Sequence, residues 1–163
     1  MAGKSLLNGK RVLIVDDEPD VLEVLEQLLS MCEVEKASSF QKAKELFESQ
    51  SFDIAILDIM GVDGFKLLEI AIEKKVIPVM LTAHALTPEN IVKSFKGGAA
   101  SFLPKEEMAN IETFLNELLE DQEKGKHFWP RWFERWESYY VKLFGFDWQD
   151  KDKEFWEKFK YYM

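Results

Sequence analysis

Short runs of apolar residues alternate with longer amphipathic segments over the first 122 residues. The runs are RVLIV from Arg11, VEKA from Val34, FDIAILD from Phe52, IPVMLTA from Ile77 and ASFLPK from Ala100. Continuous apolar runs of this length, rich in β-branched residues, are typical of strands buried on both faces of a parallel sheet. The pattern therefore predicts five strands, of which the second is weak.

Helix signals follow each predicted strand. Pro19 suits a first helical turn, and Ser38 with Gln41 forms a capping-box pattern. Residues 87–89 (TPE) give a cap, a first-turn proline and an acid in the order that starts a helix, and the glycines at 97–98 end it. The apolar positions expected to face the core in the first three helices are Val21, Leu22, Leu25, Leu28, Leu29, Ala43, Leu46, Phe47, Phe65, Leu68 and Ile72.

The third helix is expected over residues 65–75 and the last over 106–121. Strand and helix thus alternate five times, which predicts an α/β fold with a doubly wound parallel sheet. In such folds the functional site lies beyond the carboxyl ends of the strands, where the strand order reverses. Unusual polar residues should therefore stand at strand C-termini.

Polar side chains do stand where four of the predicted strands end. Residues 16–18 (DDE) follow the first strand, Asp58 ends the third, Thr82 the fourth, and Lys105 the fifth. Each alone has an ordinary alternative, because an Asp after a strand often caps a helix, a Thr in a strand is common and a Lys after one is usually solvated. Together they predict that carboxylates, a hydroxyl and an ammonium meet at one edge of the sheet.

The clustered carboxylates favour binding of a hard divalent cation. Carboxylates held close together raise the pKa of at least one of them, and a cation relieves the repulsion. Mg²⁺ prefers a few carboxylate oxygens together with water and phosphate oxygens. The sequence has no cluster of His and Cys residues of the kind that binds zinc. Asp58 is then a candidate nucleophile toward a phosphoryl group, with Lys105 neutralising charge and the Thr82 hydroxyl donating to a phosphoryl oxygen.

The motifs LIVDDEP, ILDIMGVDG, MLTAHA and FLPK, in this order and spacing, resemble the receiver domain of two-component response regulators over about residues 9–122. The resemblance implies a flavodoxin-like five-stranded fold and phosphorylation of Asp58 by a sensor histidine kinase or a phosphotransfer protein. It also implies that Mg²⁺ is held by Asp16, Asp17 and Asp58, with Asp17 a direct ligand, and by the backbone carbonyl of Met60.

The same resemblance implies a switch. Thr82 matches the switch hydroxyl, Lys105 the lysine that pairs with the phosphate, Phe102 the switch aromatic, and Ala83 the small residue beside the phosphoryl site. On phosphorylation Thr82 moves toward the phosphoryl group and Phe102 turns inward, which reshapes the face of the fourth helix, fifth strand and fifth helix. Residues 84–95 (HALTPENIVKSF) are the segment expected to move.

Three positions depart from the family pattern. The stretch from Asp58 to the DG pair is two residues shorter and lacks the usual Met-Pro, Lys105 is followed by Glu106 in place of proline, and Phe102 replaces the frequent Tyr. None of these changes removes a charged residue of the site. The sequence therefore predicts that residues 1–123 form a receiver domain that can be phosphorylated.

Residues 124–163 form a second region with a different composition. All five Trp, all four Tyr and six of the thirteen Phe lie after residue 125. Aromatic residues three or four positions apart predict a C-terminal α-helical hairpin. We expect its rings to pack as core or to bind a second copy or another protein, with attachment to a membrane surface the least favoured alternative.

Charge and composition exclude several classes of protein. The net charge is −9; residues 125–163 hold eight basic and seven acidic residues, so the first 124 carry 13 minus 23, or −10. This charge argues against nucleic-acid binding, and the second region is too short for a winged-helix domain. A single cysteine, Cys32, and an N-terminus without a long apolar stretch lead us to expect a cytoplasmic protein without a signal peptide.

Two other functions are weighed against a phosphorylation-controlled signalling module that acts through protein–protein contacts. A haloacid-dehalogenase-like phosphohydrolase also uses Mg²⁺ and an aspartate nucleophile, but places it at the end of the first strand in a DxDx(T/V) pattern, where this chain reads DDEPD. A receiver-like module that binds partners without phosphorylation is the second. This second alternative is disfavoured, because binding to a partner alone does not need the full set of phosphorylation residues. That set is intact here: Asp16, Asp17, Asp58, Thr82 and Lys105.

Overall fold

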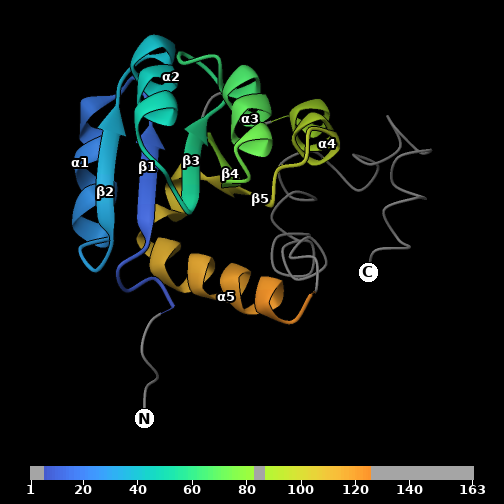
Figure 1. Ribbon diagram of the computed structural model, residues 1–163. Coiled ribbons are helices and arrows are strands. Elements are labelled where there is room, and N and C mark those ends of the chain that lie inside the picture. The colour runs from blue at the N-terminus through green and yellow to red at the C-terminus, as the bar shows by residue number, and fades with distance from the viewer. Residues whose placement is uncertain (1–5, 83–86, 126–163) are drawn as a thin grey trace.

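A computed structural model describes residues 6–82 and 87–125 of the chain. The helical hairpin expected over residues 124–163 lies outside the described residues, except for its first two positions. Strands and helices alternate as predicted (Figure 1). The elements are β1 (Arg11–Val15), α1 (Pro19–Leu28), β2 (Glu33–Ala37), α2 (Phe40–Ser49), β3 (Ile54–Asp58), α3 (Gly64–Glu73), β4 (Ile77–Thr82), α4 (Pro88–Lys96), β5 (Ser101–Pro104), the 3₁₀ helix η1 (Lys105–Asn110) and α5 (Ile111–Glu123).

The strands form one parallel sheet in the order β2-β1-β3-β4-β5. This is the flavodoxin-like order, in which the direction of winding reverses between β1 and β3. In Figure 1, α2 and α3 lie side by side above the strands and α5 runs beneath them. Helix α1 contacts α5. The site predicted from the sequence therefore falls at the carboxyl ends of β1 and β3.

The hydrophobic core lies on both faces of the three central strands. Every residue of β3 is buried, as are four of the five in β1 and five of the six in β4. Burying such side chains stabilises the fold by about 1.5–3 kcal/mol each. The sheet is thus a rigid base that holds the residues at its carboxyl edge.

The predicted helix starts and ends are mostly confirmed. Thr87 caps α4, its hydroxyl accepting a hydrogen bond from the Asn90 N–H at 3.1 Å, and Gly97 ends the helix. Pro19 opens α1. The capping box of α2 was placed one residue early, because Ser39 and not Ser38 is the cap and accepts from the Lys42 N–H at 3.2 Å.

Two predicted helix details are wrong. In α3, Leu68 is buried as predicted and Phe65 is partly buried against the core, but the other buried residues are Gly64, Leu67 and Ala71, and Ile72 is 45% exposed. Apolar residues occur nearly all around this helix, so their spacing alone does not select a face. The last helix begins at Ile111, not at residue 106, because the chain first forms η1 after β5.

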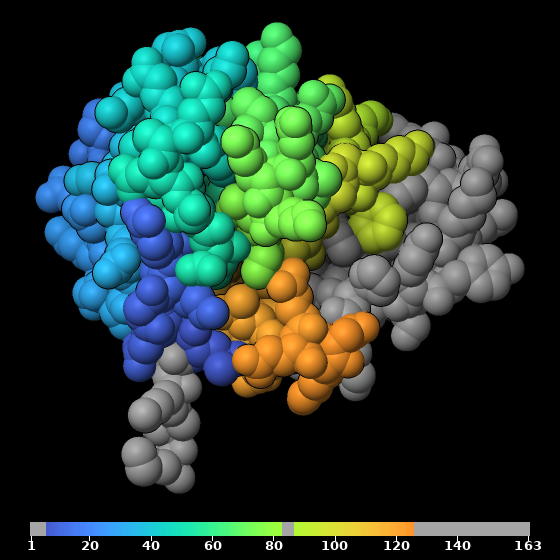
Figure 2. Space-filling model, in the orientation of Figure 1, coloured from blue at the N-terminus to red at the C-terminus, as the bar shows by residue number. Residues whose placement is uncertain are grey.

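The N-terminal segment before β1 packs against α5. The Leu6 N–H donates to Asn116 Oδ1 at 2.8 Å, and the Leu7 side chain is fully buried. Figure 2 shows this segment beside α5 on the molecular surface. None of the helices in the described part of the chain combines the length and the apolar character needed to cross a bilayer.

Candidate functional site at the carboxyl edge of the sheet

Three residues that are far apart in the sequence meet at the carboxyl edge of the sheet. Asp16 directly follows β1, Asp58 is the last residue of β3, and Lys105 directly follows β5. Asp16 and Asp58 are buried, and only 9% of the Lys105 side chain is exposed. Burial of charged groups is costly unless they are paired, so this is a site that the fold holds together by ion pairs.

The Lys105 ammonium lies among three carboxylates. Its Nζ is 2.9 Å from Asp16 Oδ2, 3.0 Å from Glu18 Oε1 and 3.6 Å from Asp58 Oδ2. Burial lowers the pKa of Lys105, but its pairing with Asp16 and Glu18 outweighs this and raises the pKa to about 12. Lys105 is therefore a permanent positive charge beside Asp58.

Asp16 is held from two directions. Its Oδ1 accepts a hydrogen bond from the Glu18 N–H at 2.9 Å. Its Oδ2 lies 2.9 Å from the Lys105 ammonium, which engages one lone pair of this oxygen and leaves the other. Burial raises the pKa of Asp16, although Lys105 opposes the rise. Asp16 thus keeps one buried oxygen with spare capacity to accept a cation or a donor.

Asp58 has the most strongly perturbed carboxyl group of the site. Burial raises its pKa to about 7, the negative charge of Asp16 adds to this, Lys105 opposes it, and Asp17 adds a smaller rise. Near neutral pH the ionised form of Asp58 is therefore less favoured than that of an ordinary aspartate. A cation bound beside it would favour the ionised, nucleophilic form.

The loop after β3 approaches Asp17 closely. Gly61 has a φ of 83°, and a Cβ placed there would overlap the carboxylate of Asp17. At Gly64, where α3 begins, a Cβ would overlap the carbonyl oxygen of Asp58 and lie 2.8 Å from the Cα of Ile59. Glycine at both positions lets the loop and the helix lie directly on the site.

The carboxylates at this edge fit a hard divalent cation. Asp16, Asp17 and Glu18 offer one oxygen each, all within 4.8 Å of one another. The exposed Asp17 carboxylate lies against the loop of Gly61, and the Asp16 Oδ2 atom is buried beside the Lys105 ammonium. Carboxylate oxygens with room for water are the donor set that Mg²⁺ prefers.

Thr82 and Phe102 lie on neighbouring strands beside the acidic cluster. Thr82 is buried at the end of β4, one residue beyond Leu81, which pairs with Asp58 across the sheet. Phe102 in β5 is fully buried. Met60, whose carbonyl was predicted to bind the metal, stands in the loop after β3 with its residue 60% exposed.

Residues 83–86, with Ala83 and His84, lie outside the described residues. The structure thus brings together Asp16, Asp17, Asp58 and Lys105. Glu18 follows the acidic pair in the sequence, but no motif there gives it a role. Its contact with Lys105 joins residues 87 positions apart, and no local pattern indicates such a pair.

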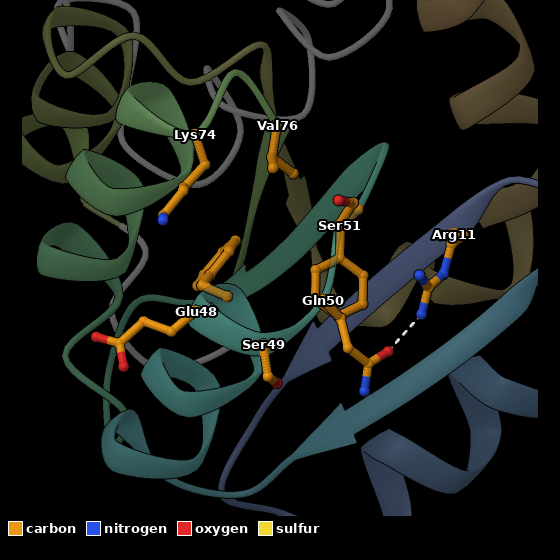
Figure 3. A pocket seen from close by; sticks show the side chains of 9 residues that line it. Arg11, Glu48, Ser49, Gln50, Ser51, Lys74 and Val76 are labelled. Carbon is orange, nitrogen blue, oxygen red and sulfur yellow. Dashed lines mark hydrogen bonds between the residues drawn. The ribbon is translucent and has the colours of Figure 1, made fainter.

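Two pockets lie at the other end of the sheet. One, of about 490 Å³, is bordered by the end of α2 and the start of β1 (Figure 3). There Arg11 donates to Gln50 and lies over the Phe52 ring, 5.5 Å from its centroid. The other pocket, lined by Leu6, Asp53 and Leu119 among others, lies between the N-terminal segment and α5. Both are remote from Asp58, since they adjoin the residues where strands begin.

Comparison with known proteins gives a consistent result. Residues 12–116 match the family model of the response regulator receiver domain. The two-component response regulators ARR18 and ARR12 of Arabidopsis thaliana are 40% and 36% identical over 63% and 73% of this chain. The matches cover 18% and 22% of those proteins, so the chain spans about a fifth of the length of these curated relatives.

Solved structures agree with the fold. A CheY-like response regulator receiver domain protein from Methanospirillum hungatei JF-1 is 27% identical, with a TM-score of 0.60 over 71% of this chain and 98% of that one. A response regulator from Burkholderia pseudomallei, solved with a phosphorylated aspartic acid, a calcium ion and citrate, gives a TM-score of 0.60 at 23% identity, over 71% of this chain and 72% of that one. The second likeness concerns the fold alone.

Proposed function

The chain belongs to the response regulator receiver family, and on this premise we propose that Asp58 accepts a phosphoryl group from a sensor histidine kinase or a phosphotransfer protein. Receiver domains are in general phospho-acceptors and not enzymes acting on separate substrates. The observation that carries the proposal is the burial of Asp58 beside Asp16 and Lys105, with Asp17 close enough to raise its pKa. Burying a carboxylate in this way lowers the stability of the fold, whereas a carboxylate beside a lysine and other acids is suited to accept a phosphoryl group.

The transfer needs Asp58 in its ionised form. One of its oxygens bonds to phosphorus while the bond between phosphorus and the donor's imidazole nitrogen breaks, and that nitrogen keeps the electron pair. Asp16 and Asp17 would hold Mg²⁺, helped by the Met60 carbonyl. When bound, the ion supplies positive charge that favours the Asp58 carboxylate and neutralises the phosphoryl oxygens.

Lys105 and Thr82 have separate roles in this proposal. Lys105, 3.6 Å from Asp58, supplies a fixed positive charge for a phosphoryl oxygen. Thr82, one residue beyond the Asp58 partner Leu81, supplies a hydroxyl donor. Movement of Thr82 toward the phosphoryl group would change the packing around Phe102 and the surface of α4, β5 and α5.

The output is proposed to be a changed protein–protein contact, with a partner or a second copy binding through the α4-β5-α5 face or residues 125–163. The acidic charge of the first 124 residues, −10, supports a protein partner over nucleic acid. A cytoplasmic location is part of the same proposal, because the single cysteine, Cys32, is a free thiol and suits a reducing compartment. Family membership favours this function over the phosphohydrolase alternative.

Acetyl phosphate with Mg²⁺ tests the proposal, followed by intact-protein mass spectrometry. We expect one labile phosphoryl adduct on the wild type, none on Asp58→Asn, and an adduct on the control variant Asp63→Asn. Asp63 lies in the same loop and has a φ of 56°, which Asn tolerates. Failure of the wild type to form an adduct would leave the phosphorylation-independent module, whereas fast release of phosphate from many substrates would indicate a phosphohydrolase.

A further inference from the structure

Glu18 belongs to the carboxylate cluster at this edge and is also a close partner of Lys105. Its Oε1 accepts a hydrogen bond from Lys105 Nζ at 3.0 Å, a shorter distance than the 3.6 Å from that Nζ to Asp58. The backbone N–H of Glu18 donates to Asp16 Oδ1 at 2.9 Å. Glu18 is therefore fixed at both its backbone and its side chain.

The conformation of the chain supports this placement. Glu18 has an extended backbone, with φ −94° and ψ 111°, and the next residue, Pro19, opens α1. Proline restricts the preceding residue to extended conformations, which limits the directions the Glu18 side chain can take. The local sequence thus restricts the Glu18 backbone, whereas the position of β5 and η1 brings Lys105 to it.

The charges of the cluster do not balance. Asp16, Glu18 and Asp58 all lie within 3.6 Å of the Lys105 ammonium, and Asp17 adds a fourth carboxylate that affects Asp58. An anion arriving at Asp58 is attracted by Lys105 and repelled by these carboxylates. Glu18 weakens that attraction in two ways, because it occupies one donor of Lys105 and because it carries negative charge.

We propose that Glu18 competes with the phosphoryl group on Asp58 for Lys105 and so limits how tightly the site holds that group. Glu18 is a positioning residue in this proposal, since it acts through Lys105 and touches no reacting atom. The inference rests on the proposed function, because it needs a phosphoryl group on Asp58.

Beryllofluoride, an anionic analogue of the phosphoryl group, measures the effect directly. The full chain is titrated with beryllofluoride at saturating Mg²⁺, which removes differences in metal affinity, and binding is followed by isothermal titration calorimetry. Glu18→Gln keeps the size and one oxygen of the side chain but removes its charge. Glu106→Gln is the matched control, because Glu106 is exposed and adjoins Lys105 in the chain without an ion pair to it among the described residues.

We expect Glu18→Gln to bind beryllofluoride about two- to fivefold more tightly than the wild type, because the side chain of Glu18 is 52% exposed and ion pairs of that exposure are weak. The control should bind as the wild type does. The gain should shrink as salt is raised from low to high ionic strength, which a merely structural effect of the substitution would not do.

Unchanged or weaker binding by Glu18→Gln would overturn the inference. A gain of equal size in Glu106→Gln, or a gain that does not change with salt, would overturn it as well.

The proposed function and this inference fail in different ways. A wild type that binds no beryllofluoride, and matches Asp58→Asn in this respect, overturns the proposed function and this inference together. A wild type that binds it while Glu18→Gln binds no more tightly overturns this inference alone.

Discussion

Substitution of Asp58 by Asn should stabilise the metal-free protein. The carboxyl group ionises near 3.8 in a chain without structure and near 7 in the fold, because burial and the charges of Asp16 and Asp17 disfavour its ionised form. A difference of about three pKa units corresponds to a free energy on the order of 4 kcal/mol. The pairing with Lys105 at 3.6 Å is already contained in this shift. Burying the uncharged but polar Asn amide offsets part of the gain, so about 1–3 kcal/mol is expected at pH 8.

The sign of the pH dependence follows from the two pKa values. Between pH 3.8 and about 7 the folded protein binds a proton on Asp58 that the unfolded chain has lost, so wild-type stability falls as pH rises through this window. Asn cannot ionise and shows no such fall. The advantage of Asp58→Asn should therefore be largest above pH 7 and should shrink steadily toward pH 4.

Urea unfolding followed by far-UV circular dichroism in EDTA, at pH 8 and pH 5, gives the two free energies of unfolding. Asp20→Asn is the control, because Asp20 is an exposed acid in the first turn of α1. The free energy of unfolding of Asp20→Asn should fall by about 0.3–1 kcal/mol, because the variant loses a favourable interaction with the helix dipole. This change is opposite in sign to the one expected for Asp58→Asn. A variant Asp58→Asn that is no more stable than the wild type at pH 8, or whose advantage is the same at pH 5, would refute the account of Asp58 as a strained buried charge.

Three further outcomes follow from the same site. Lys105→Met should raise the pKa of Asp58 above about 7, because Lys105 lowers that pKa, and should therefore reduce the yield of phosphoryl adduct at pH 7. NMR titration of the Asp58 carboxyl carbon measures the pKa, and mass spectrometry measures the yield. An unchanged pKa would contradict this prediction. Gly61→Ala should weaken Mg²⁺ binding in a calorimetric titration, because a Cβ at position 61 would overlap the Asp17 carboxylate. It should also lower the free energy of unfolding by about 1–3 kcal/mol, because the backbone there has a φ of 83°. Equal affinity for Mg²⁺ would place the metal elsewhere. Gly64→Ala should cost about 2 kcal/mol or more in urea unfolding, because its Cβ would meet backbone atoms of Asp58 and Ile59, and a neutral result would show that α3 can shift.

The sheet and its polar edge follow from short-range signals in the sequence. A strand buried on both faces, such as β3, requires an unbroken apolar run, and a carboxylate at the end of that run, Asp58, is costly to bury unless a site holds it. Parallel strands joined by helices then place Asp16, Asp58, Thr82 and Lys105 at one edge, whatever the details of the helices. The core of the site was therefore predictable from the order of the elements.

The remaining details depend on tertiary packing that no local pattern encodes. The face of α3 was misplaced because Phe65, Leu67 and Ile72 are all apolar, and only the position of the sheet and of α4 decides which are buried. Phe65, for example, lies beneath the ammonium of Lys93 from α4, 4.3 Å from the ring centroid. The contact of Glu18 with Lys105 depends in the same way on where η1 begins after β5.

The open edge at β2 bears on how copies of the protein behave when crowded together. This strand lies outermost in the sheet and reads EVEKA, with Glu33 and Lys36 exposed. A second β2 strand stacked in register would place Glu against Glu and Lys against Lys, and like charges directly opposite each other disfavour pairing. These charges thereby disfavour the parallel, in-register stacking of β2 strands that builds cross-β fibrils.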